Sequence, residues 1–380
     1  MKKIAIIGAS YLQNPLILKA KELGLETHVF AWECGDIGEQ TADFFYPISI
    51  VEKEQILEKC KAIEIDGICT IASDLAAITV NYVATKLGLT GNSIEATEKS
   101  TNKHMMRNAF EEHGDPSPKS VLVSDVSDLE GIALTYPVIV KPLDRSGSRG
   151  ITKVFDSTGL EEAIKVAEEQ GFEKHALVEE YVGGQEYSIE CISYKGEHHF
   201  LAMTKKYTSG APHFIETGHM EPAPVSKEIM SQIKEIVFHA LDSLGLKYGA
   251  SHTELKIAKD GTVRIIEIGG RMGGDFIGSN LVRISSGVDF VRAVIQVAMG
   301  DEPDLSPVCD KKYAGIRFIF TEEDVEVIRR IKKTNPEIIV ASEIHDITGE
   351  VQDSSTRFGY CLMQTNTREE LEKYLPRNEG

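Results

Sequence analysis

An Asp-Gly pair at positions 260–261 separates two runs of alternating apolar and polar residues, and it constrains how this part of the chain folds. Asp-Gly between such runs is a strong signal for a β-hairpin with a two-residue turn. In that hairpin Lys259 pairs with Thr262, and the same register places Glu254 directly opposite Glu267. A three-residue turn would shift the register by one residue and separate the two acids.

The opposed carboxylates of Glu254 and Glu267 predict a cation site. Like charges directly opposite each other destabilise an antiparallel pair, so a sequence that keeps them indicates a cation between them. Two hard carboxylates suit Mg²⁺, which takes one or two protein carboxylates and leaves its other positions to water and phosphates. The alternative is a solvated edge hairpin with two exposed acids.

The length and charge of the chain limit the classes of protein to which it can belong. At 380 residues the chain is longer than a single core usually grows, so several domains are expected. The formal net charge of −18 argues against nucleic acid or an anionic membrane as the main partner. The six cysteines show no CxxC spacing, and no run of residues is apolar for long enough to span a bilayer. We therefore expect a cytoplasmic protein with reduced thiols.

Short apolar strands alternate with helical stretches over residues 1–95. This pattern predicts a parallel sheet with helices on both faces, the α/β class. A GxGxxG fingerprint is absent, because Gly8 is the only glycine in the turn after the first strand. Ligands bind at the carboxyl ends of such strands, so Ser73 and Asp74 are candidate substrate contacts, with capping as their alternative role.

The pattern after residue 95 is typical of an α+β arrangement. The segments are a polar linker helix at 96–115 that carries Lys103, a small lobe at 116–193 with a glycine-rich loop, a larger lobe at 194–305 with the carboxylate hairpin, and a terminal portion at 306–380.

The glycine-rich loop DRSGSRG follows a buried strand that ends in Lys141. It does not match the GxxxxGK[ST] pattern of a P-loop. Glycines permit close backbone approach, successive amides can form a nest for phosphate oxygens, and a lysine adds a point charge. We expect phosphate binding by Lys141, Ser146, Gly147, Ser148, Arg149 and Gly150, with a plain turn as the alternative.

A second motif lies at residues 177–186, where a strand leads into four residues before a glycine pair and a new strand. A chain that passes between lobes exposes backbone groups that can bind an adenine edge, and a nearby acid can bind ribose hydroxyls. The candidate nucleotide contacts are Glu179, Glu180, Tyr181, Val182 and Glu186.

Taken in order, these motifs resemble the ATP-grasp superfamily over nearly the whole chain. The resemblance implies a Rossmann-like preATP domain, a two-lobed ATP-binding region and a C-terminal lid at 306–380. It also implies that Lys103 and Lys141 bind phosphates, that Glu254 and Glu267 hold magnesium, and that Arg271 acts on the substrate. Further substrate candidates on this basis are Gly273, Gly274, Asp275 and Arg357.

The chain departs from the family pattern at Gly269. The family commonly has E-x-N-x-R at the second magnesium acid, whereas this chain has EIGGR from Glu267 to Arg271. Three explanations are open: a water replaces the asparagine as a metal ligand, Asp275 compensates, or the active site has degenerated.

The segment at 209–225 contains two histidines and two glutamates, His213, Glu216, His219 and Glu221. Their spacing matches no known zinc site, and glycine and proline break any helix that would align them. We expect the segment to border the acceptor pocket, where Glu216 or His219 orients or deprotonates an amine. A surface loop is the alternative.

The resemblance implies an enzyme that uses ATP and two Mg²⁺ ions, with Mn²⁺ able to substitute, to join a small carboxylate and a small amine through an acyl phosphate. Amino acids are the expected substrates, because the overall pattern is similar to bacterial amino-acid and dipeptide ligases. The alternatives are a purine-pathway or bicarbonate-activating enzyme and an ATP-binding regulator without turnover. The expected assembly is a homodimer.

Overall fold

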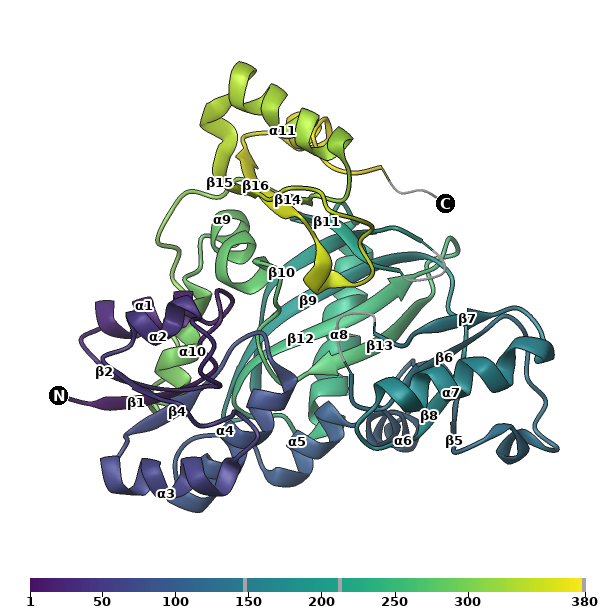
Figure 1. Ribbon diagram of the computed structural model, residues 1–380, viewed down its shortest axis with the longest axis horizontal. Helices are drawn as coiled ribbons and strands as arrows, with labels where there is room; N and C mark the ends of the chain where they lie inside the picture. Colours follow the sequence, from purple (N-terminus) through teal and green to yellow (C-terminus); the bar gives the residue numbers. More distant parts are fainter. Residues whose placement is uncertain (146–148, 211–213, 378–380) are drawn as a thin grey trace.

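The computed structural model describes residues 1–145, 149–210 and 214–377. Three β-sheets organise the chain, and the ribbon has a triangular outline with the N-terminal sheet and the small lobe at two of its corners (Figure 1). The candidate phosphate contacts Ser146, Gly147 and Ser148, and also His213, lie outside the described residues.

The N-terminal sheet is parallel, as the alternation of strands and helices predicts. Its strand order is β3-β2-β1-β4, and its buried strands carry residues such as Ile4, Ile6 and Val29. Helices connect the strands, and α4 begins where β4 has ended. The elements are β1 (Lys3–Ile7), α1 (Asn14–Glu22), β2 (Glu26–Phe30), α2 (Ile37–Thr41), β3 (Phe44–Tyr46), α3 (Lys53–Ile63), β4 (Gly67–Cys69) and α4 (Asp74–Leu87).

The small lobe is an antiparallel sheet of order β5-β8-β6-β7 with one helix packed on it. Its core is made of side chains from both layers, including Val140, Val178 and Ile164. The elements are β5 (Ser120–Val123), β6 (Val138–Pro142), β7 (Thr152–Val154), α7 (Leu160–Gln170) and β8 (Ala176–Glu180).

The third sheet has eight strands in the order β13-β12-β9-β10-β11-β14-β16-β15, all antiparallel. It begins at β9, within the range expected for the small lobe, and it continues into three strands from the range expected for the lid. Its strands are β9 (Gln185–Tyr194), β10 (Glu197–Thr208), β11 (Glu216–Glu221), β12 (Gly249–Ile257), β13 (Val263–Gly269), β14 (Tyr313–Phe318), β15 (Ile339–Ile344) and β16 (Gly359–Thr365).

Helices cover both faces of this sheet near its β12 end. Helix α8 (Lys227–Leu244) packs a face of buried Ile233, Val237 and Leu241 against it. Helix α10 (Phe290–Ala298) packs between the sheet and the N-terminal domain, where it also contacts α1. No helix among the residues that the structure describes is long and apolar enough to cross a membrane.

The carboxylate hairpin has the predicted pairing at its centre, because Glu254 lies directly opposite Glu267. The predicted Lys259–Thr262 pair is wrong, since the last rung of the ladder joins Ile257 to Val263 and a longer loop connects them. A β-bulge at Ile266 shifts the register by one residue and compensates for the longer loop. The two differences cancel, so the acids still meet.

The predicted linker helix at 96–115 is two helices rather than one. Helix α5 (Ile94–Thr101) ends at Asn102, whose side chain accepts hydrogen bonds from the backbone of the next helix, α6 (Lys103–His113). Asparagine is a favoured N-cap residue because its side-chain oxygen binds amides that lack a helical partner. The break places Lys103 in the first turn of α6.

Candidate active site

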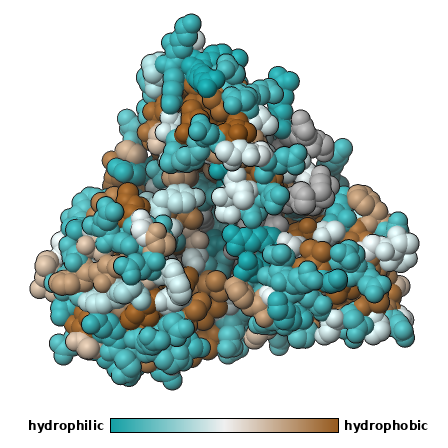
Figure 2. Space-filling view, in the orientation of Figure 1, coloured by the Kyte–Doolittle hydropathy of each residue, from teal (hydrophilic) through white to brown (hydrophobic). Residues whose placement is uncertain are grey.

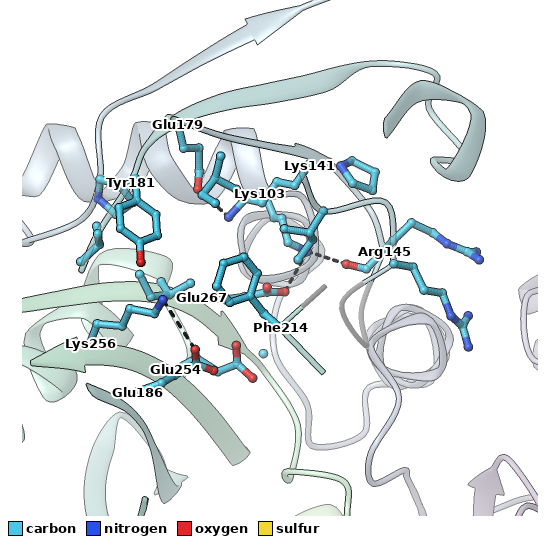
Figure 3. Close-up of a pocket in the computed structure, with 18 of the residues that line it drawn as sticks. Lys103, Lys141, Arg145, Glu179, Tyr181, Glu186, Phe214, Glu254, Lys256 and Glu267 are labelled. Carbon is cyan, nitrogen blue, oxygen red and sulfur yellow. Dashed lines mark hydrogen bonds and ion pairs between the residues drawn. The ribbon is translucent and has the colours of Figure 1, made fainter. Parts of the chain in front are cut away.

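A cavity of about 170 Å³ lies between the small lobe and the carboxylate hairpin. The surface around the hollow at the centre of Figure 2 is mostly hydrophilic or neutral. The close-up in Figure 3 shows lysines and carboxylates that converge on the cavity. Predicted site residues that line it are Lys103, Lys141, Arg149, Glu179, Glu180, Tyr181, Val182, Glu186, Glu216, Glu254, Glu267 and Arg271.

Lys141 reaches the cavity from β6 as one member of a buried charge cluster. Its Nζ lies 2.6 Å from Glu179 on β8, and the Arg107 Nε of α6 lies 2.9 Å from the same carboxylate. Burial lowers the pKa of Lys141 although the Glu179 carboxylate opposes that shift. The side chain of Glu179, expected in the adenine hinge, therefore fixes the two cations in place.

Lys103 joins the linker helix to both lobes. Its Nζ lies 2.9 Å from Glu267 and donates a 2.8 Å hydrogen bond to the carbonyl of Arg145 at the start of the glycine-rich loop. A single ammonium group thus connects the second hairpin acid with the loop expected to bind phosphates (Figure 3).

Lys206 on β10 was not predicted as a site residue, yet it stands at the centre of an acidic cluster. Its Nζ lies 2.7 Å from Glu254, 3.1 Å from Glu186 and 3.3 Å from Glu216, and its side chain is 3% exposed. Burial opposes the charged form, but the three carboxylates outweigh it and raise the pKa of Lys206 well above its ordinary value. The alternating sequence pattern of β10 does not predict this role, because the three acidic partners of Lys206 come from three other strands.

His252 also escaped prediction, although it lies two residues before Glu254 on the same face of β12. Its Nδ1 is hydrogen-bonded to the buried Glu190, and its Nε2 lies 3.4 Å from Glu254. Burial lowers the pKa of His252, but Glu190 outweighs it and raises the value to about 9. The amide of Gly273 donates to the other oxygen of Glu190. Its position two residues before Glu254 could have predicted it, because residues two apart on a strand lie on the same face.

The side chains of Glu254 and Glu267 suit a divalent cation. They face each other across one hairpin, they lie at the wall of the cavity, and each carries a lysine partner from another strand or helix. Among the described residues, no group of three histidine, cysteine or acidic side chains could hold a metal. Two carboxylates with phosphate and water ligands form the donor set that Mg²⁺ prefers.

Arg271 extends from the end of β13 and meets the N-terminal domain. Its Nε and Nη2 lie 2.8 and 2.9 Å from the two carboxylate oxygens of Asp74 at the start of α4. Ser73, the other candidate at this strand end, caps α4 through a hydrogen bond from Ala76. Arg271 faces the nucleotide cavity, and Asp74 lies behind it.

A second cluster joins the 209–225 segment to the terminal portion of the chain. Arg357 donates to Asp275 at 2.8 Å and to Glu216 at 3.1 Å, and it lies over the ring of Phe318. His219 is buried on β11, so this part of the segment is not a surface loop. Neither ring nitrogen of His219 has a hydrogen-bond partner among the described residues.

Asp275 lies in this second cluster and not beside Gly269. Its backbone has a φ of 51°, which is uncommon for a residue other than glycine, and the next residue, Phe276, shares this conformation. Burial raises the pKa of Asp275, but the nearby Arg357 outweighs it and holds the value well below the ordinary range. Asp275 therefore pairs with Arg357 and does not replace the asparagine that is missing at position 269.

A comparison with known protein families identifies the central part of the chain. Residues 134–279 match the family model described as "ATP-grasp domain". The chain carries an ATP-grasp domain. The match covers the strand of Lys141, the glycine-rich loop and the carboxylate hairpin, and the ATP-grasp fold implies use of ATP and a divalent metal.

Three known proteins extend the likeness beyond the ATP-grasp domain. Alanine–anticapsin ligase of Bacillus subtilis is 27% identical over 334 residues, which cover 78% of this chain and 70% of the relative. The crystal structure of L-amino acid ligase from Bacillus licheniformis superposes with a TM-score of 0.82 at 25% identity and covers 98% of this chain and 96% of that one. Phosphoribosylglycinamide synthetase from Anaerococcus prevotii shares the fold. Its crystal structure superposes with a TM-score of 0.77 at 21% identity and covers 98% of this chain and 96% of that one.

Proposed function

We propose that this protein is an ATP-dependent ligase that joins the carboxyl group of one amino acid to the amino group of another through an acyl phosphate, with release of ADP and phosphate. The observation that carries the proposal is the convergence of Lys103, Lys141, Arg271 and the opposed pair Glu254 and Glu267 on one cavity. The likeness to L-amino acid ligase over nearly the whole chain supports amino acids as the substrates.

The nucleotide half of the site has a group for each part of ATP. Residues 180–182 line the cavity where the chain leaves the small lobe, and Glu186 lies beyond them on β9. Lys103 and Lys141 present positive charge where the triphosphate would lie. Phosphoryl transfer depends on positioning and charge neutralisation more than on covalent help from the protein, and this inventory meets that need.

The metal site would be formed by Glu254 and Glu267. A Mg²⁺ ion held there would supply Lewis-acid charge for phosphoryl transfer. The proposal includes two ions and substitution by Mn²⁺. Lys206 holds Glu254 and Lys103 holds Glu267, so the chain keeps both acids aimed at the cavity.

Arg271 would bind the oxygens of the substrate carboxyl group and of the tetrahedral centre that forms from it. A planar guanidinium offers two parallel donors to such a group, and it stabilises charge that grows during the reaction. The attacking amine would lie near the cluster of Glu216, His219, Asp275 and Arg357, because Glu216 lines the nucleotide cavity and also contacts Arg357. Burial lowers the pKa of His219 and favours its neutral imidazole, whose Nε2 lies 3.8 Å from Asp275 and could orient the amine.

The test is phosphate release from Mg·ATP against amino acids, offered singly and in pairs, with ribotides and bicarbonate alongside. We expect turnover only with particular amino-acid pairs, together with a ligated product seen by mass spectrometry. Activity on a ribotide or bicarbonate alone would instead favour the purine-pathway or bicarbonate alternative. Binding of ATP without turnover in every mixture would favour the regulator.

The proposal also includes a homodimer and a cytoplasmic location. Size-exclusion chromatography with light scattering tests the dimer, and a mass of 41.9 kDa would contradict it.

A further inference from the structure

The Asp74–Arg271 pair joins two parts of the chain that are 197 residues apart. Asp74 opens helix α4 of the N-terminal domain, and Arg271 follows the last strand of the hairpin. Their side chains are 20% and 14% exposed, so water competes little with this contact. The pair is bidentate, with Nε and Nη2 each donating to a different carboxylate oxygen.

Glycine at position 269 leaves room for this pair, because it has no Cβ atom. A Cβ atom at position 269 would lie 2.8 Å from Oδ1 of Asp74 and 3.2 Å from Cζ of Arg271. No positive φ is involved, so the requirement for glycine here is one of space and not of backbone conformation. The carboxylate of Asp74 fills the volume that a side chain at 269 would need.

Arg271 also lies at two cavities. It lines the nucleotide cavity, and it lines a second cavity of about 60 Å³ between α4, β4, α10 and the start of β12. Strand β12 runs along both, since His252 and Glu254 line the first cavity and Ala250 lines the second. The Arg271 side chain therefore forms part of the wall of each cavity.

We propose that Asp74 is a positioning residue that locks Arg271 across the boundary between the two cavities, and that residue 269 is glycine to admit the Asp74 carboxylate. The inference rests on the proposed function for what Arg271 does. It also explains why this chain departs from the family pattern at position 269. The Asp74 carboxylate, which comes from another domain, takes the space that an asparagine side chain would need.

The lock has two chemical consequences. Asp74 occupies the Nε–Nη2 edge of the guanidinium. Nη1 makes only a long 3.4 Å hydrogen bond with the carbonyl of Met272, so we expect Nη1 and the second hydrogen of Nη2 to be the donors that meet the substrate oxygens. We also expect a fixed Arg271 to help keep water from an acyl phosphate, whose hydrolysis would consume ATP without forming product. Asp74 therefore controls both the rate of ligation and its coupling to ATP.

The first experiment replaces Asp74 by asparagine, which keeps the size and removes the charge. We expect kcat with the amino-acid pair found in the screen to fall about 10- to 100-fold, because misplacement of a positioning group by 1 Å costs rates of that order. The KM for ATP stays within about twofold, and more than one ADP is released for each product formed. Asp304→Asn breaks a remote pair with Arg292 and is the control for loss of a salt bridge.

The second experiment needs no activity. Gly269→Ala is made in the natural chain and in an Asp74→Ala background, and the melting temperature is measured in each. In the natural chain the added methyl group overpacks the pair and lowers Tm by about 2–10 °C. In the Asp74→Ala background the nearest atom, Oδ1, is absent and Arg271 is no longer held beside position 269, so the same change lowers Tm by less than half as much. Gly349→Ala, at a position with nothing within 4 Å, is the control in both backgrounds.

The two experiments separate this inference from the proposed function. If the natural chain ligates amino acids while Asp74→Asn keeps the natural kcat and coupling, the lock is refuted and the ligase stands. If no mixture supports turnover, the proposed function fails, and the Tm cycle still decides whether Asp74 takes the space at position 269. Equal Tm losses in both backgrounds would overturn the match between Asp74 and Gly269.

Discussion

The Nζ atom of Lys206 lies 2.7 Å from the carboxylate of Glu254, at the bottom of a cluster in which one lysine meets three acids. Burial raises the pKa of Glu254, but the Lys206 ammonium outweighs it and holds the value well below the ordinary range. The lysine thereby keeps the carboxylate ionised and aimed at the cavity. One ammonium connects the proposed metal ligand Glu254, the expected ribose acid Glu186 and the substrate candidate Glu216.

Lys206→Met should therefore cost both stability and activity. Removal of one partner leaves buried charges uncompensated, which costs about 3–5 kcal/mol of unfolding free energy. We expect kcat to fall at least tenfold as well, since Glu254 loses its alignment. Urea denaturation and steady-state kinetics measure the two effects. Lys205→Met, at the neighbouring lysine over the ring of Tyr207, is the matched control, and equal losses in both variants would contradict the role of Lys206.

Glu267→Gln should abolish substrate-dependent ADP release. The change keeps the shape of the side chain and removes the charge that a divalent cation requires, so the affinity for Mg²⁺ falls. A titration of activity with Mg²⁺ measures it, and Glu302→Gln on the surface is the control. Natural turnover at ordinary Mg²⁺ concentrations would exclude Glu267 as a metal ligand.

Glu221→Gln should change how stability depends on pH. Burial raises the pKa of Glu221 from 4.5 to about 7, and hydrogen bonds from Thr204 and Ser285 offset only part of that shift. Because the folded-state pKa is the higher one, the group contributes stability below about pH 4.5 and loses it as the pH rises through 7. The loss approaches about 3 kcal/mol above pH 7.

The glutamine variant lacks this titration, so its stability relative to the natural chain should rise between pH 5 and pH 8. Urea unfolding at several pH values measures the difference, with Glu235→Gln as an exposed control. A constant difference between the two proteins across this range would disprove titration of Glu221.

Arg357→Lys should raise the KM for the amino-acid substrate by about tenfold and leave the KM for ATP unchanged. Lysine keeps the charge but cannot reach Asp275 and Glu216 with separate nitrogens while covering the ring of Phe318. Steady-state kinetics with each substrate varied in turn measure the split. Arg329→Lys, in an exposed pair with Glu326, is the control, and a matching rise in the KM for ATP would place Arg357 in the nucleotide site.

The sequence alone predicted the pairing of the two acids that lie on one hairpin. Glu254 and Glu267 were correctly opposed because alternation and a turn signal fix local register, even though the loop was longer than predicted and a bulge corrected it. The same logic failed at 96–115, where the apolar pattern continues through Asn102 while its side chain caps a new helix.

Contacts between distant segments could not be predicted. Lys206, His252 and Glu190 owe their surroundings to the order of strands in the eight-stranded sheet, which no local pattern encodes. Asp74 was expected to touch substrate, and its pairing with Arg271 depends on how the N-terminal domain docks. Position 269 differed from the family pattern, but the reason for it lies 195 residues earlier in the chain.

The eight-stranded sheet has a consequence for how the enzyme opens. The carboxylate hairpin and the terminal strands β14–β16 belong to one hydrogen-bonded plate, and β11 is joined to β14 by four backbone pairs. Movement of the terminal strands would break that ladder, so we expect the four-stranded small lobe, which is a separate sheet, to move when ATP enters. A pair of fluorophores that links the small lobe to the plate should report nucleotide entry, while a pair within the plate should stay silent.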